Sequence, residues 1–434
     1  MLADLRLVFS SKLVVGVLFI SFLTRVLVYF FFLPSSPSKF GPDEGTYALL
    51  AKFVADGSPV YEFPLYGEPL FHSSKSLIWP SVILIKLGMD ELSSIRTISS
   101  IYGLLSSLFL ALCFVAWKQL INQKFDLKTK LFGRKFLLLI SVFSFWPSNY
   151  LWSIIGLRES GSQFWIISVF YFLLSLFRRK GDIPLALAGV VVVSLTFAFA
   201  MRPETVMVFC AVAIAVIFFK LLKKRNKLNF LVLSSLLVGF ISGEAFTSSG
   251  TSSGTSLASQ VLIGLLKNIE SARTSNRLDA LSALPLSSCS EVDQDALTLL
   301  GCNLSELPYQ FFSFMFRPVI LSDNGSPMFN YAAIENVGWT ILILMTLWAS
   351  LRRCQTLQVR FIQMSLGSYI ILFSLGAALY EGNLGTAFRH KSAILWVLIF
   401  ILMISNETFS KEKNFRNITT FRFLSAKTKS RENP

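Results

Sequence analysis

Histidine is almost missing from this chain, which has 434 residues and only two histidines, His72 and His390. A metal centre built on several histidines is therefore excluded, because such centres need several nitrogen or sulfur ligands. Cysteine is also scarce, with five residues, of which Cys289 and Cys302 lie in the same polar segment. A disulfide between these two stays open, since sequence spacing does not establish the geometry that a disulfide requires.

Charged residues are few as well, at 15% of the chain, whereas hydrophobic residues make up 53% and include 42 Phe. A soluble protein of this length could not cover so much apolar surface, and a helix that crosses a bilayer needs about 20 mostly apolar residues. We therefore predict an all-α polytopic membrane protein with about ten transmembrane helices. The expected spans are 13–33, 95–117, 136–153, 161–177, 183–201, 205–222, 228–246, 332–351, 361–380 and 391–405.

Basic residues cluster after alternate spans, at 118–135, 178–180, 220–227, 352–353 and from 411 onward. Cytoplasmic loops carry such an excess of Lys and Arg. We expect both termini in the cytoplasm of a multi-pass protein of the cell inner (plasma) membrane. The net charge of +15 then reflects topology, so no nucleic-acid partner is expected. The first apolar stretch is too long for a signal peptide and lacks a small-residue cleavage site, so it is expected to be an anchor.

Two extracytoplasmic loops are expected to be long and to carry short interfacial helices. In the first loop, the apolar piece 77–87 is too short to span and is expected to lie in the interface or to re-enter. In the second loop, an amphipathic helix is expected over 257–284. The predicted organisation is an N-terminal transmembrane module at 1–246 with its first outer loop at 34–94, a long outer loop at 247–331, C-terminal transmembrane helices at 332–410 and a basic tail at 411–434.

Charges on the expected outer side lie at the edges of the spans, where charge is costly and usually has a reason. Arginine binds phosphate well, because its planar guanidinium group donates two parallel hydrogen bonds. A mixture of carboxylates and arginines therefore predicts a site for an anionic, phosphate-bearing substrate, with the groups converging on one outer-facing cavity. The groups are Asp43-Glu44, Arg158-Glu159, Arg202-Pro203-Glu204 and Arg389-His390-Lys391.

Each group also has a structural explanation that the sequence leaves open. Asp43 and Glu44 begin a predicted helix, whose dipole favours acidic residues in the first turn. The pair at 158–159 could form an ion pair within its own loop, and the charges at 202–204 and 389–391 could anchor to lipid headgroups.

Four further residues carry weaker signals. Glu335 is expected in the first turn of a span, either compensating the helix dipole or contacting substrate. Arg317 follows a Phe-rich, interfacial stretch. Arg25 lies inside the first span, so an internal ion pair is expected. Trp152 suits the aromatic belt at the membrane interface.

The first part of the chain resembles a known family. A span with an internal arginine precedes DEGTY at 43–47, of the form D-E-x-x-Y, then a short helix and GSPVY at 57–61, of the form G-x-x-x-Y, before a Pro-rich approach to the membrane. Over roughly residues 10–120 this pattern resembles the GT-C superfamily of integral-membrane glycosyltransferases. The resemblance is greatest to the bacterial protein-mannosyltransferase-like and aminoarabinose-transferase-like members.

This resemblance implies that Asp43 or Glu44 is the catalytic base or helps to place a metal. A sugar would move from a polyprenyl-phosphate or polyprenyl-diphosphate donor to a glycan, lipid or protein acceptor, with inversion, at the extracytoplasmic face, in work on cell-envelope polysaccharide. A divalent cation such as Mg or Mn stays open. The expected substrate-binding residues are Tyr47, Tyr61, Arg158, Glu159, Arg202, Glu204, Arg317, Glu335, Arg389, His390 and Lys391.

Two other functions remain as alternatives. An O-antigen or exopolysaccharide repeat-unit polymerase would use similar outer-face arginines and a long outer loop. A lipid-linked oligosaccharide flippase or other transporter would place ionisable groups near the bilayer midplane and often shows internal repeats. The sequence shows no repeat and keeps its charges at one face, so it favours the transferase.

Overall fold

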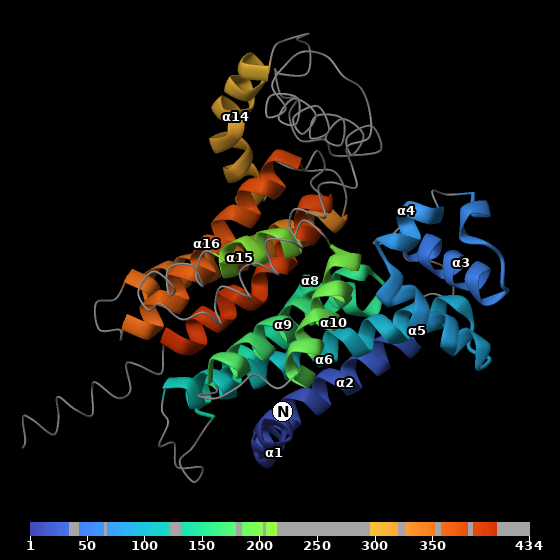
Figure 1. The fold of residues 1–434 in the computed structure, drawn as a ribbon, viewed down its shortest axis with the longest axis horizontal. Helices are drawn as coiled ribbons and strands as arrows, with labels where there is room; N and C mark the ends of the chain where they lie inside the picture. Colours follow the sequence, from blue (N-terminus) through green and yellow to red (C-terminus); the bar gives the residue numbers. More distant parts are fainter. Residues whose placement is uncertain are drawn as a thin grey trace, which may run out of the picture.

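A computed structural model describes residues 1–33, 43–64, 67–121, 132–178, 185–202, 205–214, 296–319, 327–351, 357–380 and 385–405. These residues form helices and no strand (Figure 1), which confirms the all-α prediction for the described chain. The helices are α1 (Leu2–Ser10), α2 (Lys12–Phe32), α3 (Asp43–Ala55), η1 (Val60–Glu62), α4 (Gly67–His72), α5 (Lys75–Lys86), α6 (Glu91–Ile121), α7 (Arg134–Phe145), α8 (Pro147–Ile154), α9 (Arg158–Arg178), α10 (Leu185–Met201), α14 (Ala296–Phe316), α15 (Pro327–Leu351) and α16 (Leu357–Tyr380), together with Thr205–Ile214 and Gly385–Ser405.

Six of these helices are long and apolar enough to cross a membrane, as in a multi-pass membrane protein. The count rises to seven if α7 and α8, bent by 48°, form one span. The predicted count of ten is not confirmed. The expected span 136–153 is broken where Pro147 begins α8, and the described apolar helices at 186–201 and 205–214 are shorter than a full span. The expected span 228–246, the expected helix 257–284 and the pairing of Cys289 lie outside the described residues.

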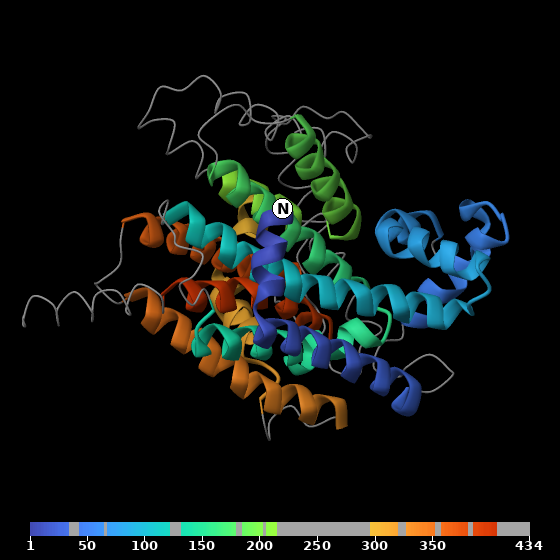
Figure 2. The same ribbon diagram turned by 90° about the horizontal axis from the view of Figure 1, so that it is seen from below.

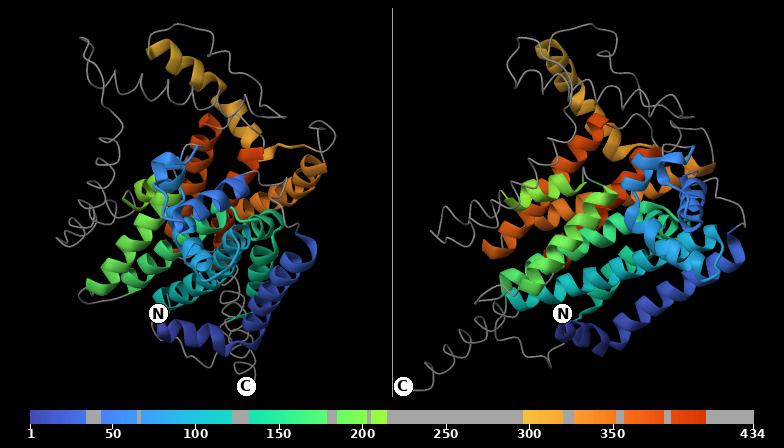
Figure 3. Two further views of the ribbon diagram at one scale, coloured as in Figure 1. Left: turned by 90° about the vertical axis from the view of Figure 1, so that its right-hand side faces the viewer. Right: turned by 45° about the vertical axis from the view of Figure 1, so that its right-hand side comes forward.

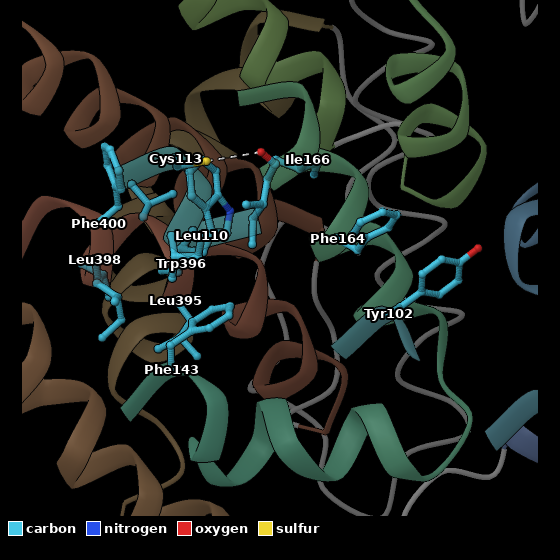
Figure 4. Packing of buried hydrophobic residues seen from close by; sticks show 14 of the residues in the cluster. Tyr102, Leu110, Cys113, Phe143, Phe164, Ile166, Leu395, Trp396, Leu398 and Phe400 are labelled. Carbon is cyan, nitrogen blue, oxygen red and sulfur yellow. Dashed lines mark hydrogen bonds between the residues drawn. The ribbon is translucent and has the colours of Figure 1, made fainter. Parts of the chain in front are cut away.

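The helix Gly385–Ser405 forms the centre of the bundle. In an apolar stretch of 18 residues within this helix, 83% of the residues are buried, whereas the corresponding value for α2 is 22%. Figure 4 shows Leu395 and Trp396 of this helix gathered with Leu110 and Cys113 of α6. In both panels of Figure 3, α2 runs along the edge of the bundle. The apolar side chains that α2 turns outward match a lipid-facing surface, because lipid tails are as apolar as the side chains they meet.

Small side chains let α6 approach its neighbours closely, as in many membrane helix pairs. A Cβ added at Gly103 would lie 2.4 Å from the Cβ of Ser153 in α8. Ser99 Oγ lies near the backbone oxygens of Trp152 and Leu157, at 3.1 Å from each. Trp152 is only 1% exposed, so the expected position in an interfacial belt is wrong, and its ring meets Phe388 in the central helix instead.

Arg25 joins α2 to the α7–α8 bend. Its Nε donates to Ser153 Oγ at 2.9 Å and its NH2 group to the backbone oxygen of Ser144 at 3.2 Å. Its guanidinium also lies 4.7 Å from the ring centre of Tyr150. All of its described partners are neutral, so the expected internal ion pair is wrong. Hydrogen bonds and a π-face satisfy this buried cation instead.

Residues 43–86 fold onto one end of the bundle. Figures 1 and 2 both place α3, α4 and α5 together at that end, and α3 packs on α5 and α6. Two ion pairs join α3 to α6. Arg96 donates to the two carboxylate oxygens of Glu44, at 2.6 Å and 3.2 Å, with both side chains buried. Lys52 and Glu91 meet at 3.5 Å in an exposed pair.

The two pairs allow a matched test of what holds α3 on the bundle. We expect Glu44→Ala to destabilise the protein by about 3–5 kcal/mol, because it leaves the buried guanidinium of Arg96 without its carboxylate. Lys52→Ala removes the exposed pair and is expected to cost at most about 1 kcal/mol. Thermal unfolding of purified protein in nanodiscs measures both. Equal effects of the two variants would show that Glu44 does not anchor α3.

Candidate active site

Four segments that are distant in the sequence bring charged side chains together. They are the first residue of α3, the start of α9, the residue after α10, and the first turns of Gly385–Ser405. The most distant contact joins Arg389 to Asp43, whose carboxylate oxygen accepts from the guanidinium at 2.6 Å across 346 residues of sequence. Asp43 keeps 44% of its side chain exposed, whereas Arg389 keeps 15%.

Glu159 and Arg202 form the second ion pair of this cluster. Arg202 NH2 donates to Glu159 Oε1 at 2.5 Å, with both side chains largely buried. Arg158 instead donates to the backbone oxygen of Ser73, at the turn between α4 and α5, at 3.4 Å. The ion pair within the 158–159 loop is therefore not formed, and Arg202 is turned into the protein rather than toward lipid headgroups.

The charged side chains of this cluster lie close enough to interact electrostatically. The carboxylate of Glu159 interacts with four of them, namely Arg202, Arg389, Arg158 and His390. Tyr47, one turn along α3 from Asp43, is buried among them. Burial raises the pKa of the Tyr47 phenol. The charges of Arg158 and Arg202 lower this pKa, and the carboxylates of Asp43 and Glu159 raise it. Among the described residues of the cluster, three arginines thus face two carboxylates, which is an excess of positive charge.

A small pocket, which we call the site pocket, opens in this cluster. Its cavity of about 10 Å³ holds about one water molecule. Its walls come from α9, Arg202, Thr205, α16 and the central helix, and its lining residues are Glu159, Ser162, Gln163, Ile166, Arg202, Thr205, Phe373, Arg389, His390, Ser392 and Ala393.

A second cavity, of about 110 Å³, lies farther along the same helices, and we call it the apolar cavity. In α9, Ile166 lines the site pocket and Phe170 lines the apolar cavity. In α16, Phe373 lines the site pocket and Tyr369 lines the apolar cavity. Of the residues lining the apolar cavity, only Ser365 and Tyr369 carry a polar side-chain group. The same helices therefore line a charged pocket and, farther along, an apolar cavity.

Lys391 belongs to a separate buried cluster on the other side of the central helix. Its Nζ donates to the backbone oxygen of Arg317 at 2.7 Å and to Asn336 Oδ1 at 2.8 Å. With 1% exposure, Lys391 cannot anchor to headgroups. Glu335 accepts from Ser148 at 2.6 Å and lies more than two turns into α15, not in the first turn of a helix as expected.

The predicted site residues thus separate into distinct places. Asp43, Tyr47, Arg158, Glu159, Arg202, Arg389 and His390 converge. Glu44 is next to Asp43 in the chain but is fully buried against Arg96. Tyr61 is 71% exposed on η1 and is in no described contact with the cluster. Glu204 lies outside the described residues.

Sequence reasoning missed several residues that build the site. Arg96 was detectable, because a charged residue at the start of the expected span 95–117 is the same signal as Arg25. Gln163, which lines the site pocket, and Asn336, which binds Lys391, are uncharged amides within spans. Their positions carry no signal in hydropathy or charge, so only the folded arrangement identifies them.

Comparison of the chain with models of protein families, with curated proteins and with solved structures finds no match. The geometry of the cluster therefore carries the functional argument by itself.

The contact between α3 and the central helix can be tested without any substrate. In a double-mutant cycle, we expect Asp43→Asn and Arg389→Gln to be non-additive by about 1 kcal/mol in unfolding free energy, because each removes the same ion pair. Lys52→Ala combined with Arg389→Gln serves as the control and should be additive. Additive effects of the first pair would mean that the two side chains do not interact in the membrane-embedded protein.

Proposed function

We propose that this protein is an integral-membrane glycosyltransferase of the GT-C type that uses a lipid-linked sugar donor at the extracytoplasmic face. The observation that carries the proposal is the position of Asp43, a half-exposed carboxylate bonded to Arg389, which lines a pocket together with Arg202 and His390. A base beside an anion-binding group is what transfer from a phosphate-linked sugar to a hydroxyl requires.

Asp43 is the general base in this proposal, and Glu44 is a positioning residue. The two carboxylates are adjacent in α3, but only Asp43 reaches solvent, while Glu44 is enclosed with Arg96. A base must come within hydrogen-bonding distance of the acceptor hydroxyl, and an enclosed carboxylate cannot. Glu44 contributes by fixing α3 against α6, which sets the position of its neighbour.

The arginines stabilise the charge that develops on the leaving group. As the acceptor oxygen bonds to the anomeric carbon, the bond from that carbon to the phosphate oxygen breaks. The lipid phosphate leaves with the electron pair, and the acceptor proton passes to Asp43. Arg202 and Arg389 lie where fixed positive charge favours this separation. Attack on the face opposite the phosphate inverts the anomeric centre.

The Asp43–Arg389 ion pair couples donor binding to the base. Arg389 donates to one carboxylate oxygen of Asp43 at 2.6 Å, which keeps that oxygen from an acceptor hydroxyl. A donor phosphate competes for the guanidinium and draws it from Asp43. Asp43 then becomes free to accept the proton of the acceptor hydroxyl. The base is thus held inactive until the donor is bound.

The apolar cavity supports a donor that is linked to lipid. It lies farther along the helices that line the site pocket, so a phosphate at Arg389 would leave an attached hydrocarbon chain free to follow those helices. Apolar burial contributes about 0.8 kcal/mol for each CH₂ group, which would add greatly to the affinity of the phosphate.

No step of this mechanism passes through a metal. Among the described residues, no group of three or more His, Cys, Asp and Glu side chains comes together. The carboxylates of Asp43 and Glu159 are each bonded to an arginine. In this donor set, guanidinium groups supply the positive charge at the phosphate.

The role of the base predicts the effect of Asp43→Asn. We expect sugar transfer to fall by about 100-fold or more, because the amide cannot accept the acceptor proton. Binding of undecaprenyl phosphate should persist, since Arg389 remains. Glu62→Gln, which changes an exposed carboxylate on η1, is the matched control and should keep full activity. Full activity of Asp43→Asn would place the base elsewhere.

The role of Arg389 predicts a loss of donor affinity. In nanodiscs, we expect Arg389→Ala to weaken binding of undecaprenyl phosphate by about tenfold to a hundredfold, which is the value of a hydrogen bond to a charged group. Lys52→Ala removes an exposed cation on α3 and should leave this binding unchanged. Native mass spectrometry measures both. Unchanged binding by Arg389→Ala would overturn the phosphate site.

A further inference from the structure

Among the described residues, no hydrogen-bond donor reaches two buried oxygens in the wall of the site pocket. They are Oε2 of Glu159 and Oε1 of Gln163. The Glu159 side chain is 5% exposed and Gln163 is 2% exposed. An unsatisfied buried acceptor costs about 1–3 kcal/mol, so two in one pocket indicate a ligand that brings hydrogen-bond donors.

The orientation of each side chain keeps its free oxygen for that ligand. Gln163 Nε2 donates to the backbone oxygen of Ser392 at 3.0 Å. A flipped amide would place an oxygen against that carbonyl, so the observed orientation is favoured. Glu159 Oε1 already accepts from Arg202, which leaves Oε2 available.

Two donors of the pocket lining are directed elsewhere. Ser392 Oγ donates to the backbone oxygen of Arg389 at 2.7 Å. Arg389 itself donates to Asp43. The excess of arginine in the cluster also disfavours a metal cation as the missing partner. A neutral hydroxyl donor, either a water molecule or a hydroxyl group of a ligand, remains as the chemistry that fits.

The rest of the pocket suits one face of a sugar ring. Ile166, Phe373 and Ala393 give it apolar walls beside the two acceptors. Glu159 and Gln163 are four residues apart on α9, so they share one face with about 5–6 Å between their Cβ atoms. A sugar ring has hydroxyls around its rim and apolar C–H faces, which is the same combination.

We propose that Glu159 and Gln163 form a subsite that recognises the hydroxyl groups of the donor sugar; this rests on the proposed function above. The subsite adjoins the phosphate-binding arginine, because Gln163 binds Ser392, three residues after Arg389 on the same helix. Its ligand is therefore the group attached to the phosphate. The described cavity of about 10 Å³ must widen to admit a sugar ring.

The test compares two ligands in nanodiscs by native mass spectrometry. One is undecaprenyl phosphate, and the other is undecaprenyl phosphate that carries mannose, glucose, N-acetylglucosamine or aminoarabinose. The measured quantity is the ratio of the affinities for the sugar-bearing and the bare phosphate. Gln163→Met removes the acceptor oxygen, whereas Gln163→Glu keeps one, and both lose the bond to Ser392. Charge effects on the phosphate cancel in the ratio.

We expect wild-type protein to prefer at least one sugar-bearing lipid. Gln163→Met should reduce that preference by about tenfold, and Gln163→Glu should keep it within about twofold. Arg389→Ala should weaken both ligands without changing the ratio. The subsite is overturned if no sugar is preferred, or if Gln163→Met keeps the wild-type ratio. Failure of wild-type protein to bind undecaprenyl phosphate at all would instead overturn the proposed function, and the subsite with it.

Discussion

A helix that begins with basic residues runs through the most buried part of the bundle, and the rest of the site depends on this constraint. Positive charge in such a place needs acceptors, because an unpaired buried charge costs several kcal/mol. Arg389 binds Asp43, and Lys391 binds the backbone oxygen of Arg317 and the amide of Asn336. The acceptors for this one helix therefore come from α3, from α15 and from the residue that follows α14.

Two adjacent acids of α3 show how one short motif can serve two purposes. Consecutive helical residues point about 100° apart, so Glu44 turns toward α6 while Asp43 turns toward Arg389 of the central helix. The enclosed pair with Arg96 fixes the helix, and the exposed carboxylate is the one that the proposed mechanism uses as the base. Structural and chemical roles are thus separated by a single residue step. In the proposed mechanism, this anchor limits how far Asp43 moves when Arg389 leaves it.

Prediction from the sequence was most successful for properties that depend on charge and hydropathy over short stretches of the chain. Charges at the ends of spans marked Asp43, Arg158, Glu159, Arg202 and Arg389, all of which the fold brings together. It went wrong where the folded chain supplied neighbours that the sequence does not show: Trp152 is enclosed by the central helix instead of facing the interface, and Arg25 meets neutral groups instead of an ion-pair partner. For the pair at 158–159, which the sequence left open, the ion pair within the loop does not form, because Glu159 pairs with Arg202.

The sequence by itself determined that the described chain is helical, that several helices are apolar enough to cross a membrane, and which few charges lie at their ends. These properties follow from periodicity and composition over about 20 residues at a time. Only the tertiary structure decided which charges pair, which of two adjacent acids stays accessible, and which amide joins the pocket. Those outcomes depend on distances between segments as far apart as Asp43 and Arg389, and no local pattern encodes such distances.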